Sequence, residues 1–554
     1  MSRTPSAPRH HAAGLLHHLQ VEWDADLVGG DPLGWPGYAE TLDHLPKGDS
    51  VLTGRAAVDR ARTAGRYVVI AGRFDVLGGS MGAVHGERVV RAYRRAALER
   101  LPVVVLASSG GARLQEGMVA LAQMARTAAA ARAHARAGLL SIAVMRAPTT
   151  GGVLASYVSL ADLRAAEPGA TVGFAGPRVV EVTTGAPPPP YSHTAESAYA
   201  VALVDALVPP AEQAGWVEAA IGLRDVRLQG RPALATAGTD PFPAQAAGPW
   251  LEVLRARARG RLTGIDHAAR LCDSWVELRG TDPTVRAALA RIGARRVVVV
   301  ANDRRAGAGR PGPAGYRLFR RALALAVRLR LPFLTLVDTP GADPGPGSEA
   351  EGIAAEIAET FAAMAEATIP TVAVCVGEGG SGGALAMAAS DRLLMLEHAV
   401  FSVIGPEGAA AILARDPTQA SRFADRLHLT ATDVSATVSA ASTPCPPGGS
   451  ARCRPPRPIA LPAGGRARVS SPPRWWPCSW PSSSGSRWWS WPTTARSRAT
   501  SGRRCSSPGG AGNWRRSSPP AGPSACRRCS APPGPSICST WAPTRRRGGW
   551  PSRR

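Results

Sequence analysis

The segment Val-Val-Val-Leu-Ala-Ser-Ser-Gly-Gly-Ala (103–112) is an apolar run that ends in a glycine pair. Phe-Leu-Thr-Leu-Val-Asp-Thr-Pro-Gly-Ala (333–342), 230 residues later, is a similar apolar run that ends in Pro-Gly. In both copies a second glycine turn follows at the same distance, because Gly152 lies 41 residues after Gly111 and Gly382 lies 41 residues after Gly341. A constant offset of this kind predicts one fold used twice, with a backbone-amide site in each half. Such a pair of sites suits an enzyme that handles two carbonyl-bearing substrates.

The sequence around these turns alternates short apolar runs with amphipathic or alanine-rich segments. This alternation predicts an α/β fold with mostly parallel or mixed sheets covered by helices. The expected strands are 66–77, 103–107, 140–146, 170–174, 296–301, 333–337 and 371–376, and the expected helices are 84–100, 115–137, 151–160, 315–329, 349–367 and 382–389.

The net charge of +24 is concentrated at one end of the chain. Residues 434–554 contain 20 arginines but no Asp, Glu or Lys, which leaves 45 basic and 41 acidic residues in 1–433. A nearly neutral body lacks the basic face of a folded nucleic-acid-binding domain, so we expect no nucleic-acid partner.

The same C-terminal segment holds nine of the fourteen tryptophans and seven of the nine cysteines. This bias is typical of GC-rich DNA translated out of frame, so we interpret 434–554 as a frameshift-like, disordered tail; the alternative is a disordered basic tail. Cys526 and Cys529 stand in it without a spaced partner pair and do not indicate a zinc site. The predicted organisation is a leader (1–50), an N-half (51–240), a C-half (241–433) and the tail (434–554).

The compartment is predicted from cysteine usage and from missing targeting signals. Only Cys272 and Cys375 precede the tail, which favours a reducing environment. Because the chain shows neither a secretory h-region nor a run of about 18 apolar residues, we expect a cytoplasmic protein without a membrane span. The paired histidines before residue 19 are interpreted as part of a solvated leader, and no metal site is predicted.

A glycine pair at the start of a helix can form a carbonyl-binding site. Glycine has no Cβ to block a ligand, and the first helical amides are unpaired and lie at the positive end of the helix dipole. Such amides can stabilise an oxyanion or enolate. Gly151-Gly152 and Gly382-Gly383 both fit this description, although tight strand–helix packing alone would also explain glycines there.

Three other patterns are weaker. The G-x-G-x-x-G match at 307–312 is interrupted by prolines, so it does not predict dinucleotide binding. Asp338-Thr-Pro-Gly341 resembles a GTPase switch, but Lys47 is the only lysine and no phosphate loop surrounds it. Serines in the glycine-rich turns lack an evident His and acid for nucleophilic catalysis.

Several motifs in order resemble the carboxyltransferase component of biotin-dependent acyl-CoA carboxylases, in the crotonase superfamily. Gly78-Gly-Ser-Met-Gly82, Ser109-Gly-Gly-Ala-Arg-Leu-Gln-Glu-Gly117, Pro148-Thr-Thr-Gly-Gly152 and Gly173-Phe-Ala-Gly-Pro-Arg-Val179 resemble the bacterial β subunit. Asp338-Thr-Pro-Gly-Ala342, Gly377-Glu-Gly-Gly-Ser-Gly-Gly-Ala384 and Ser402-Val-Ile-Gly-Pro-Glu-Gly408 resemble the α subunit. The resemblance covers roughly 55–433 and implies a β–α fusion with two crotonase-like (ClpP/crotonase) ββα-repeat domains in tandem.

The resemblance also implies the reaction and the residues that perform it. Carboxybiotin on a separate carrier protein would release carbon dioxide, and the ureido anion would take the α-proton of acetyl-CoA or a related acyl-CoA. The resulting enolate would attack carbon dioxide to give malonyl-CoA or its analogue for fatty acid or polyketide synthesis. By motif position, the amides of Gly151 and Gly152 would bind the acyl thioester oxygen, and those of Gly383 and Ala384 would bind the biotin carbonyl oxygen. The residues implied for substrate binding are Gly110, Gly111, Arg113, Gly379, Gly380 and Gly382. The alternative role for Arg113 is a structural hydrogen bond to the loop.

The implied partners are the biotin carboxyl carrier protein, biotin carboxylase and a second copy of the chain in a dimer of fused halves. Two departures from the family pattern stand out: the β-subunit zinc ribbon is absent, and family character ends near Asp433. The alternatives are therefore another crotonase-superfamily enzyme, such as a hydratase or decarboxylase, and an inactive truncated product or non-catalytic subunit. A carboxylate facing Gly151 would favour a hydratase. The sequence does not indicate which acyl-CoA is used.

Overall fold

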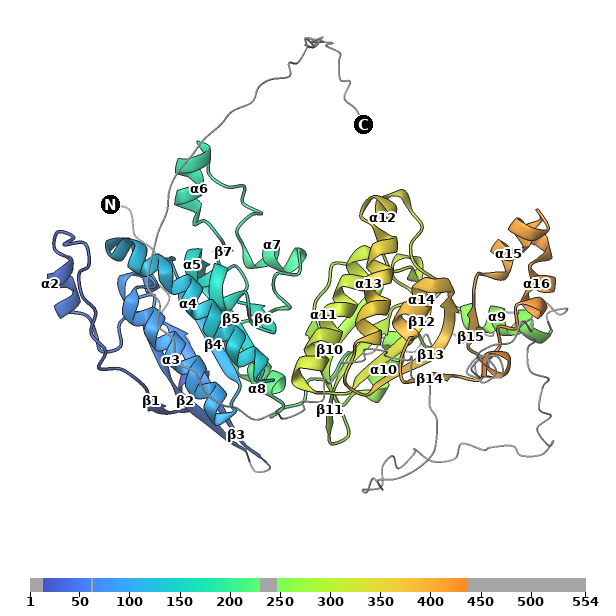
Figure 1. Ribbon diagram of the computed structural model, residues 1–554, viewed down its shortest axis with the longest axis horizontal. Coiled ribbons are helices and arrows are strands. Elements are labelled where there is room, and N and C mark those ends of the chain that lie inside the picture. The colour runs from blue at the N-terminus through green and yellow to red at the C-terminus, as the bar shows by residue number, and fades with distance from the viewer. Residues whose placement is uncertain (1–12, 61–62, 230–246, 436–554) are drawn as a thin grey trace, which may run out of the picture. The chain divides into compact units, whose positions relative to one another are not determined.

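The computed structural model describes residues 13–60, 63–229 and 247–435. Apart from its first two residues, the segment 434–554 that we interpret as frameshift-like lies outside this range. The fold consists of two mixed α/β halves, each built on its own sheet (Figure 1).

The first sheet has the order β1-β2-β3-β4-β5-β6-β8, with β7 paired to β5. β1, β2 and β3 are antiparallel neighbours, whereas the pairs from β3 to β8 are parallel. All seven residues of β4 are buried, as expected for an apolar parallel strand covered on both faces. The strands are β1 (Leu19–Glu22), β2 (Val51–Arg60), β3 (Thr63–Gly72), β4 (Val103–Ser109), β5 (Ser141–Thr150), β6 (Leu163–Ala166), β7 (Val172–Gly173) and β8 (Ala206–Leu207).

The second sheet has the order β14-β13-β12-β11-β10-β9, with β15 paired to β13. It repeats the mixed pattern, because β9, β10 and β11 are antiparallel and the remaining pairs are parallel. The strands are β9 (Ser274–Leu278), β10 (Val285–Ile292), β11 (Arg295–Asn302), β12 (Phe333–Thr339), β13 (Thr371–Gly380), β14 (Arg392–Met395) and β15 (Val400–Ser402).

Amphipathic helices pack on these sheets. In the first half α3 and α4 lie side by side (Figure 1), and in the second half α11 packs beside α13. The helices of the first half are α1 (Ala13–Leu16), α2 (Tyr38–Asp43), α3 (Ala83–Glu99), α4 (Gly117–Arg136), α5 (Gly151–Val153), α6 (Pro177–Thr184), α7 (Ala195–Ala200) and α8 (Gln213–Ile221). Those of the second half are α9 (Gly248–Arg257), α10 (Gly264–Leu271), α11 (Pro313–Leu329), α12 (Pro346–Ala350), α13 (Ile353–Ala365), α14 (Ser381–Ala388), α15 (Pro406–Leu413) and α16 (Ala420–Arg426).

The repeat inferred from the sequence is a structural repeat with the same offset. α3 and α11 are both 17 residues long, start 230 residues apart and end at arginine C-caps with φ 55° and ψ 43°. The bounds of β4 and β12, and those of β5 and β13, are also 230 residues apart. The prediction of one α/β fold used twice is therefore confirmed.

Residues 19–50 differ from the predicted solvated leader. β1 pairs with β2 at the edge of the first sheet, and the α2 residue Tyr38 is buried. The Tyr38 hydroxyl donates a 2.6 Å hydrogen bond to Oε1 of Glu116, 78 residues away. This attachment depends on backbone pairing and on long-range side-chain bonds, neither of which leaves a periodic signal in the sequence.

Two predicted helices are interrupted in the structure. The helix predicted at 349–367 is divided into α12 and α13 at Gly352, whose φ of 78° is left-handed and interrupts the helix. The helix predicted from Gly151 to about Leu160 has three α-helical residues followed by a π-helical turn, Leu154–Val158. There the Ser156 hydroxyl donates to the Gly152 carbonyl at 2.6 Å, a bond that competes with regular helix pairing.

Partly buried ion pairs connect α11 with the first half. Arg321 donates to both carboxylate oxygens of Asp205 at 2.8 and 3.0 Å, and the Asp205 side chain is fully buried. Arg328 pairs with Asp162 and also donates to the Leu139 carbonyl at 2.9 Å. Within the described ranges, no helix is long and apolar enough to cross a membrane.

Candidate functional site

In the first half, two glycine turns face each other at the ends of neighbouring parallel strands. After β4, Gly111 adopts φ 121° and its amide donates to the Ser109 hydroxyl at 3.1 Å. After β5, Gly151 adopts φ 60°, and a Cβ at this position would lie 2.7 Å from Gly111 Cα. Only glycine allows the two turns to approach this closely, which explains why glycine occupies positions 111 and 151.

The second half repeats this arrangement. Gly341 adopts φ 126°, and its amide donates to the Thr339 hydroxyl at 3.1 Å. The opposite turn begins α14 at Ser381, which has φ 58°. By the 230-residue offset, Ser381 corresponds to Gly151 and Gly382 to Gly152.

The amides at these helix starts differ in whether they are free to bind a ligand. The Gly151 amide donates to the Phe174 carbonyl at 2.8 Å, and the Gly110 amide donates to the Gly78 carbonyl at 2.8 Å. Gly152 follows as the second residue of α5, where helix geometry provides no carbonyl partner. In α14 the same geometry pairs the Ala384 amide with a carbonyl of the preceding turn and leaves Gly383 as the last unpaired amide.

The surroundings of the two turns also differ. A Cβ on Gly152 would lie 3.2 Å from Met124 Cγ and Sδ and 3.6 Å from Met81 Cε, so this turn is covered by thioether side chains. A Cβ on Gly382 would meet nothing within 4 Å. One on Gly383 would lie 2.6 Å from the Tyr316 hydroxyl. The first turn is therefore apolar, whereas the second is open at Gly382 and has a phenol behind Gly383.

Arg113 supports the first turn from inside the protein. Its guanidinium is fully buried and binds Asp49 through two hydrogen bonds of 2.5 and 2.8 Å. It also donates to the Ser80 carbonyl and the Ser50 hydroxyl at 2.9 and 3.0 Å. Burial would raise the pKa of Asp49, but hydrogen bonds and charge from Arg113 outweigh it and hold that pKa below its usual range. Arg113 is thus engaged within the chain and presents no free guanidinium at the surface.

Glu116 connects the same loop to two other elements. One carboxylate oxygen accepts from Tyr38, and the other accepts from the Ala83 amide at the start of α3 at 2.6 Å. Arg113 Nη1 lies 3.3 Å from Glu116 Oε1, which completes a buried cluster of charges and hydroxyls. The cluster holds the Gly110–Gly117 loop between α2 and α3.

A second buried ion-pair cluster supports the C-half turns. Arg261 binds both oxygens of Asp338, at 2.6 and 2.7 Å, and the Asp338 side chain is fully buried. Glu378, which precedes the glycine run, accepts from Arg257 at 2.7 Å and from Arg304 at 3.4 Å. The Glu378 amide in turn donates to Asp338 at 3.3 Å. These bonds position the two loops of the second half relative to each other.

The structure therefore brings the predicted residues together in two groups. Gly110, Gly111, Gly151 and Gly152 face one another in the first half, and Gly379, Gly380, Gly382, Gly383 and Ala384 form one continuous turn in the second, where Gly379 pairs with Thr339. Sequence reasoning missed the supporting residues Tyr38, Asp49, Glu116, Arg257, Tyr316 and Glu378. Glu116 and Glu378 lie inside the quoted motifs and the other four lie outside them, and only long-range contacts reveal the supporting role of each.

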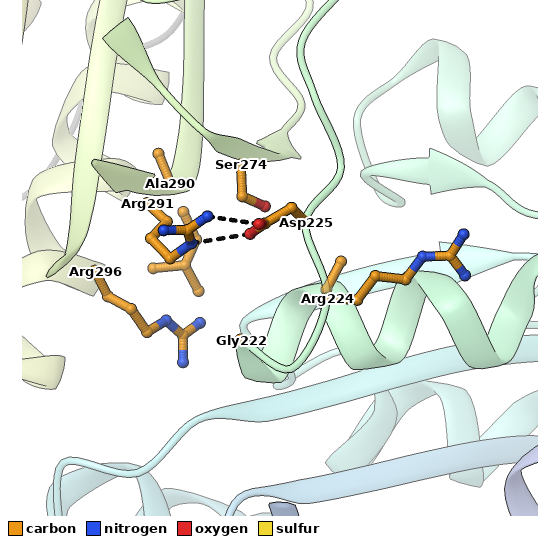
Figure 2. Close-up of a pocket in the computed structure, with 9 residues that line it drawn as sticks. Gly222, Arg224, Asp225, Ser274, Ala290, Arg291 and Arg296 are labelled. Carbon is orange, nitrogen blue, oxygen red and sulfur yellow. Dashed lines mark hydrogen bonds and ion pairs between the residues drawn. The ribbon is translucent and has the colours of Figure 1, made fainter. Parts of the chain in front are cut away.

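A small pocket lies apart from both groups, at the junction of α8 with β9–β11 (Figure 2). Arg291 reaches across it to Asp225, with Nε 2.9 Å from Oδ1, and Arg296 and Ser274 also line it. Its lining includes none of the predicted site residues. Among the described residues, no group of three or more His, Cys, Asp or Glu side chains could hold a metal ion.

Comparison with known proteins agrees with this geometry. A family model described as acetyl co-enzyme A carboxylase carboxyltransferase-like matches residues 244–450, and a carboxyl transferase domain model matches residues 38–199. The chain is 42% identical over 407 residues to a Salinispora tropica protein named acetyl-coenzyme A carboxylase carboxyl transferase subunits beta/alpha. The matched region covers 70% of this chain and 71% of that protein.

A Mycobacterium bovis protein named "Probable biotin-dependent acyl-coenzyme A carboxylase beta3 subunit" is 37% identical, over 76% of this chain and 86% of that protein. Among solved structures, transcarboxylase 12S with methylmalonyl-coenzyme A bound has a TM-score of 0.62 and 22% identity, over 76% of this chain and 84% of that one. This structural likeness shows the fold, and it confirms the tandem crotonase-like architecture predicted from the motifs.

Proposed function

Because the chain belongs to the acetyl-CoA carboxylase carboxyltransferase family, we propose that it moves a carboxyl group from carboxybiotin to acetyl-CoA or a related acyl-CoA. With acetyl-CoA the product is malonyl-CoA, a precursor for fatty acid or polyketide synthesis. The observation that carries the proposal is the matched pair of glycine turns, each with an unpaired amide at a helix start.

The first-half turn suits the acyl thioester. Removing the α-proton places negative charge on the thioester oxygen, and the Gly152 amide at the positive end of a helix can stabilise that charge. Met81 and Met124 beside Gly152 provide an apolar surface for the acyl group. The atoms nearest Cβ positions on Gly151 and Gly152 belong to Gly110, Gly111 and these methionines, and none is a carboxylate of the kind a hydratase requires.

The second-half turn suits a planar carbonyl group such as the ureido group of biotin. The open space at Gly382 admits a ligand, and the Gly383 amide can donate to its oxygen. When bound, carboxybiotin supplies the carbon dioxide and the base that takes the α-proton, so no side-chain base is needed in this chain. Of the residues predicted from the motifs, Gly152 and Gly383 donate their amides to the ligand oxygens in this proposal, whereas Gly151 and Ala384 shape the turns around them.

We further propose that biotin arrives on a separate carrier protein, that a biotin carboxylase charges it, and that the chain forms a homo-oligomer. The name of the M. bovis relative and the hexamer assembly reported for transcarboxylase 12S support these partners. Exposed apolar side chains near the first-half loop, at Leu114, Met118 and Leu121, support an additional protein contact. The cytoplasmic location predicted from cysteine usage stays a prediction.

Carboxyl transfer from malonyl-CoA to free biotin, the reverse reaction, tests the proposed function with the full chain. We expect the wild-type protein to produce acetyl-CoA only when biotin is present, and Gly152→Val to abolish this reaction. Gly30→Val is the matched control, because Gly30 lies in a loop and a Cβ there meets nothing within 4 Å. A wild-type chain that is folded but transfers nothing would contradict the proposal.

A further inference from the structure

The two halves differ at one position of otherwise matched turns. The first residue of the helix is Gly151 in the first half and Ser381 in the second, and both have a left-handed φ, of 60° and 58°. In the first half a Cβ here would lie 2.7 Å from Gly111 Cα, whereas the second half holds the exposed side chain of Ser381 at this position. The second-half turn is therefore wide enough for a side chain, and it carries a hydroxyl.

The Ser381 hydroxyl is available to a ligand. The residue is exposed, and it makes no hydrogen bond to another residue of the described ranges. Its neighbour Gly382 borders open space. A serine with a left-handed backbone is conformationally unfavourable compared with glycine, so the fold by itself gives no reason to prefer serine here.

A second hydroxyl, contributed by α11 beside the same turn, also lacks a partner. Tyr316 is fully buried, its hydroxyl points at Gly383, and it has no hydrogen-bond partner within the described chain. Burial raises the pKa of Tyr316, which keeps the phenol neutral. The 230-residue offset places Gly86 at the equivalent position of α3, so the first half has no such group. A buried hydroxyl left unpaired indicates a polar site that the protein alone does not complete.

The two kinds of carbonyl ligand need different partners. A thioester oxygen only accepts hydrogen bonds, so backbone amides are sufficient for it. A ureido ring presents an N–H donor beside its carbonyl oxygen, and amide N–H groups cannot accept from it, whereas a hydroxyl can. The turn that carries a hydroxyl is therefore adapted to a ligand with both a donor and an acceptor.

We propose that the Ser381 hydroxyl binds the ureido group of biotin in the second-half turn, by accepting a hydrogen bond from the ring N–H. The inference rests on the proposed function, and it assigns Ser381 as the residue that distinguishes the biotin turn from the acyl-CoA turn.

Two substitutions separate the hydroxyl from the backbone. Ser381→Gly installs the residue that the first half uses and relieves the left-handed strain, whereas Ser381→Ala removes the hydroxyl and keeps the strain. The control is Ser390→Ala, because Ser390 lies beyond the far end of α14, where it donates to the Ala388 and Arg392 carbonyls. Each full-length variant is assayed for carboxyl transfer from malonyl-CoA to free biotin and titrated with free biotin by NMR.

Both Ser381 variants should raise the KM for biotin about three- to ten-fold, the effect of losing one hydrogen bond, and leave the KM for malonyl-CoA within about two-fold of wild type. An unchanged KM for biotin in Ser381→Gly would overturn the proposal, as would a defect confined to Ser381→Ala. If the wild-type chain transfers nothing, the proposed function fails, but the NMR titration still decides the role of Ser381. Weaker biotin binding by both variants supports it, and equal or absent binding refutes it.

Discussion

Removing Arg113 should destabilise the first half because it leaves a buried carboxylate without its cation. Asp49 is 5% exposed, and both of its carboxylate oxygens are bound by Arg113. In Arg113→Met the apolar side chain keeps most of the volume, while Asp49 retains the Ser50 amide as a partner. Breaking a buried ion pair from one side typically costs about 3–5 kcal/mol.

The size of the effect can be measured by urea unfolding followed by circular dichroism. With a urea m-value of about 2–3 kcal/mol/M, a loss of this size lowers the unfolding midpoint of the first half by roughly 1–2 M. The matched control is Arg126→Met, which removes an arginine that is 45% exposed and pairs with Glu87 on the surface. Surface pairs contribute about 0–1 kcal/mol, so the control midpoint should move little.

The double variant Arg113→Met with Asp49→Asn tests the reasoning itself. Removing both charges avoids the unpaired carboxylate, so we expect it to recover most of the stability lost in Arg113→Met. If the single variant loses less than about 1 kcal/mol, or if the double variant is no more stable than the single one, the unpaired carboxylate is not the cause.

Three further predictions concern the turns and a buried histidine. Gly152→Val should abolish carboxyl transfer while the unfolding midpoint stays near that of wild type, because the side-chain atoms nearest the added Cβ belong to the flexible Met124 and Met81; full activity would refute the site assignment. Tyr316→Phe should raise stability by about 1 kcal/mol, since it removes an unpaired buried hydroxyl, and should lower the carboxyl-transfer rate; a more stable variant with unchanged kinetics would assign the hydroxyl no function. Burial lowers the pKa of His85 to about 3, overcoming the charge of Asp49, so the unfolded chain binds a proton below pH 6.5 that the folded chain does not. Stability should therefore fall by about 1.4 kcal/mol from pH 7.5 to pH 5.5, and His85→Gln should remove this part of the pH dependence in urea unfolding.

The sequence indicated the repeat because equivalent turns need glycine for steric reasons. Gly111 and Gly341 both adopt a left-handed φ close to 120°, and each precedes its facing turn by a constant number of residues. Apolar strands such as Val103–Ser109 were recognisable because parallel strands are buried on both faces. The fold class, the two halves and the longest helices therefore followed from local pattern and spacing.

The supporting residues could not be found in this way. Tyr38 and Glu116 are 78 residues apart, and Arg113 and Asp49 are 64 residues apart, so neither pair belongs to one motif. Nor could the sequence predict which amides in the turns are free, because it does not show that the Gly151 amide is already bonded to the Phe174 carbonyl.

The sequence by itself predicted two glycine-lined turns, which we propose as carbonyl sites, on a duplicated α/β fold. A glycine requirement is local, since it depends on the conformation of a single residue. Only the tertiary structure decided which amides remain unpaired, that Arg113 lies buried against Asp49, and that the Tyr316 hydroxyl of α11 lies behind Gly383. These properties depend on contacts between distant segments, and burial and hydrogen bonding exist only once those segments have packed together.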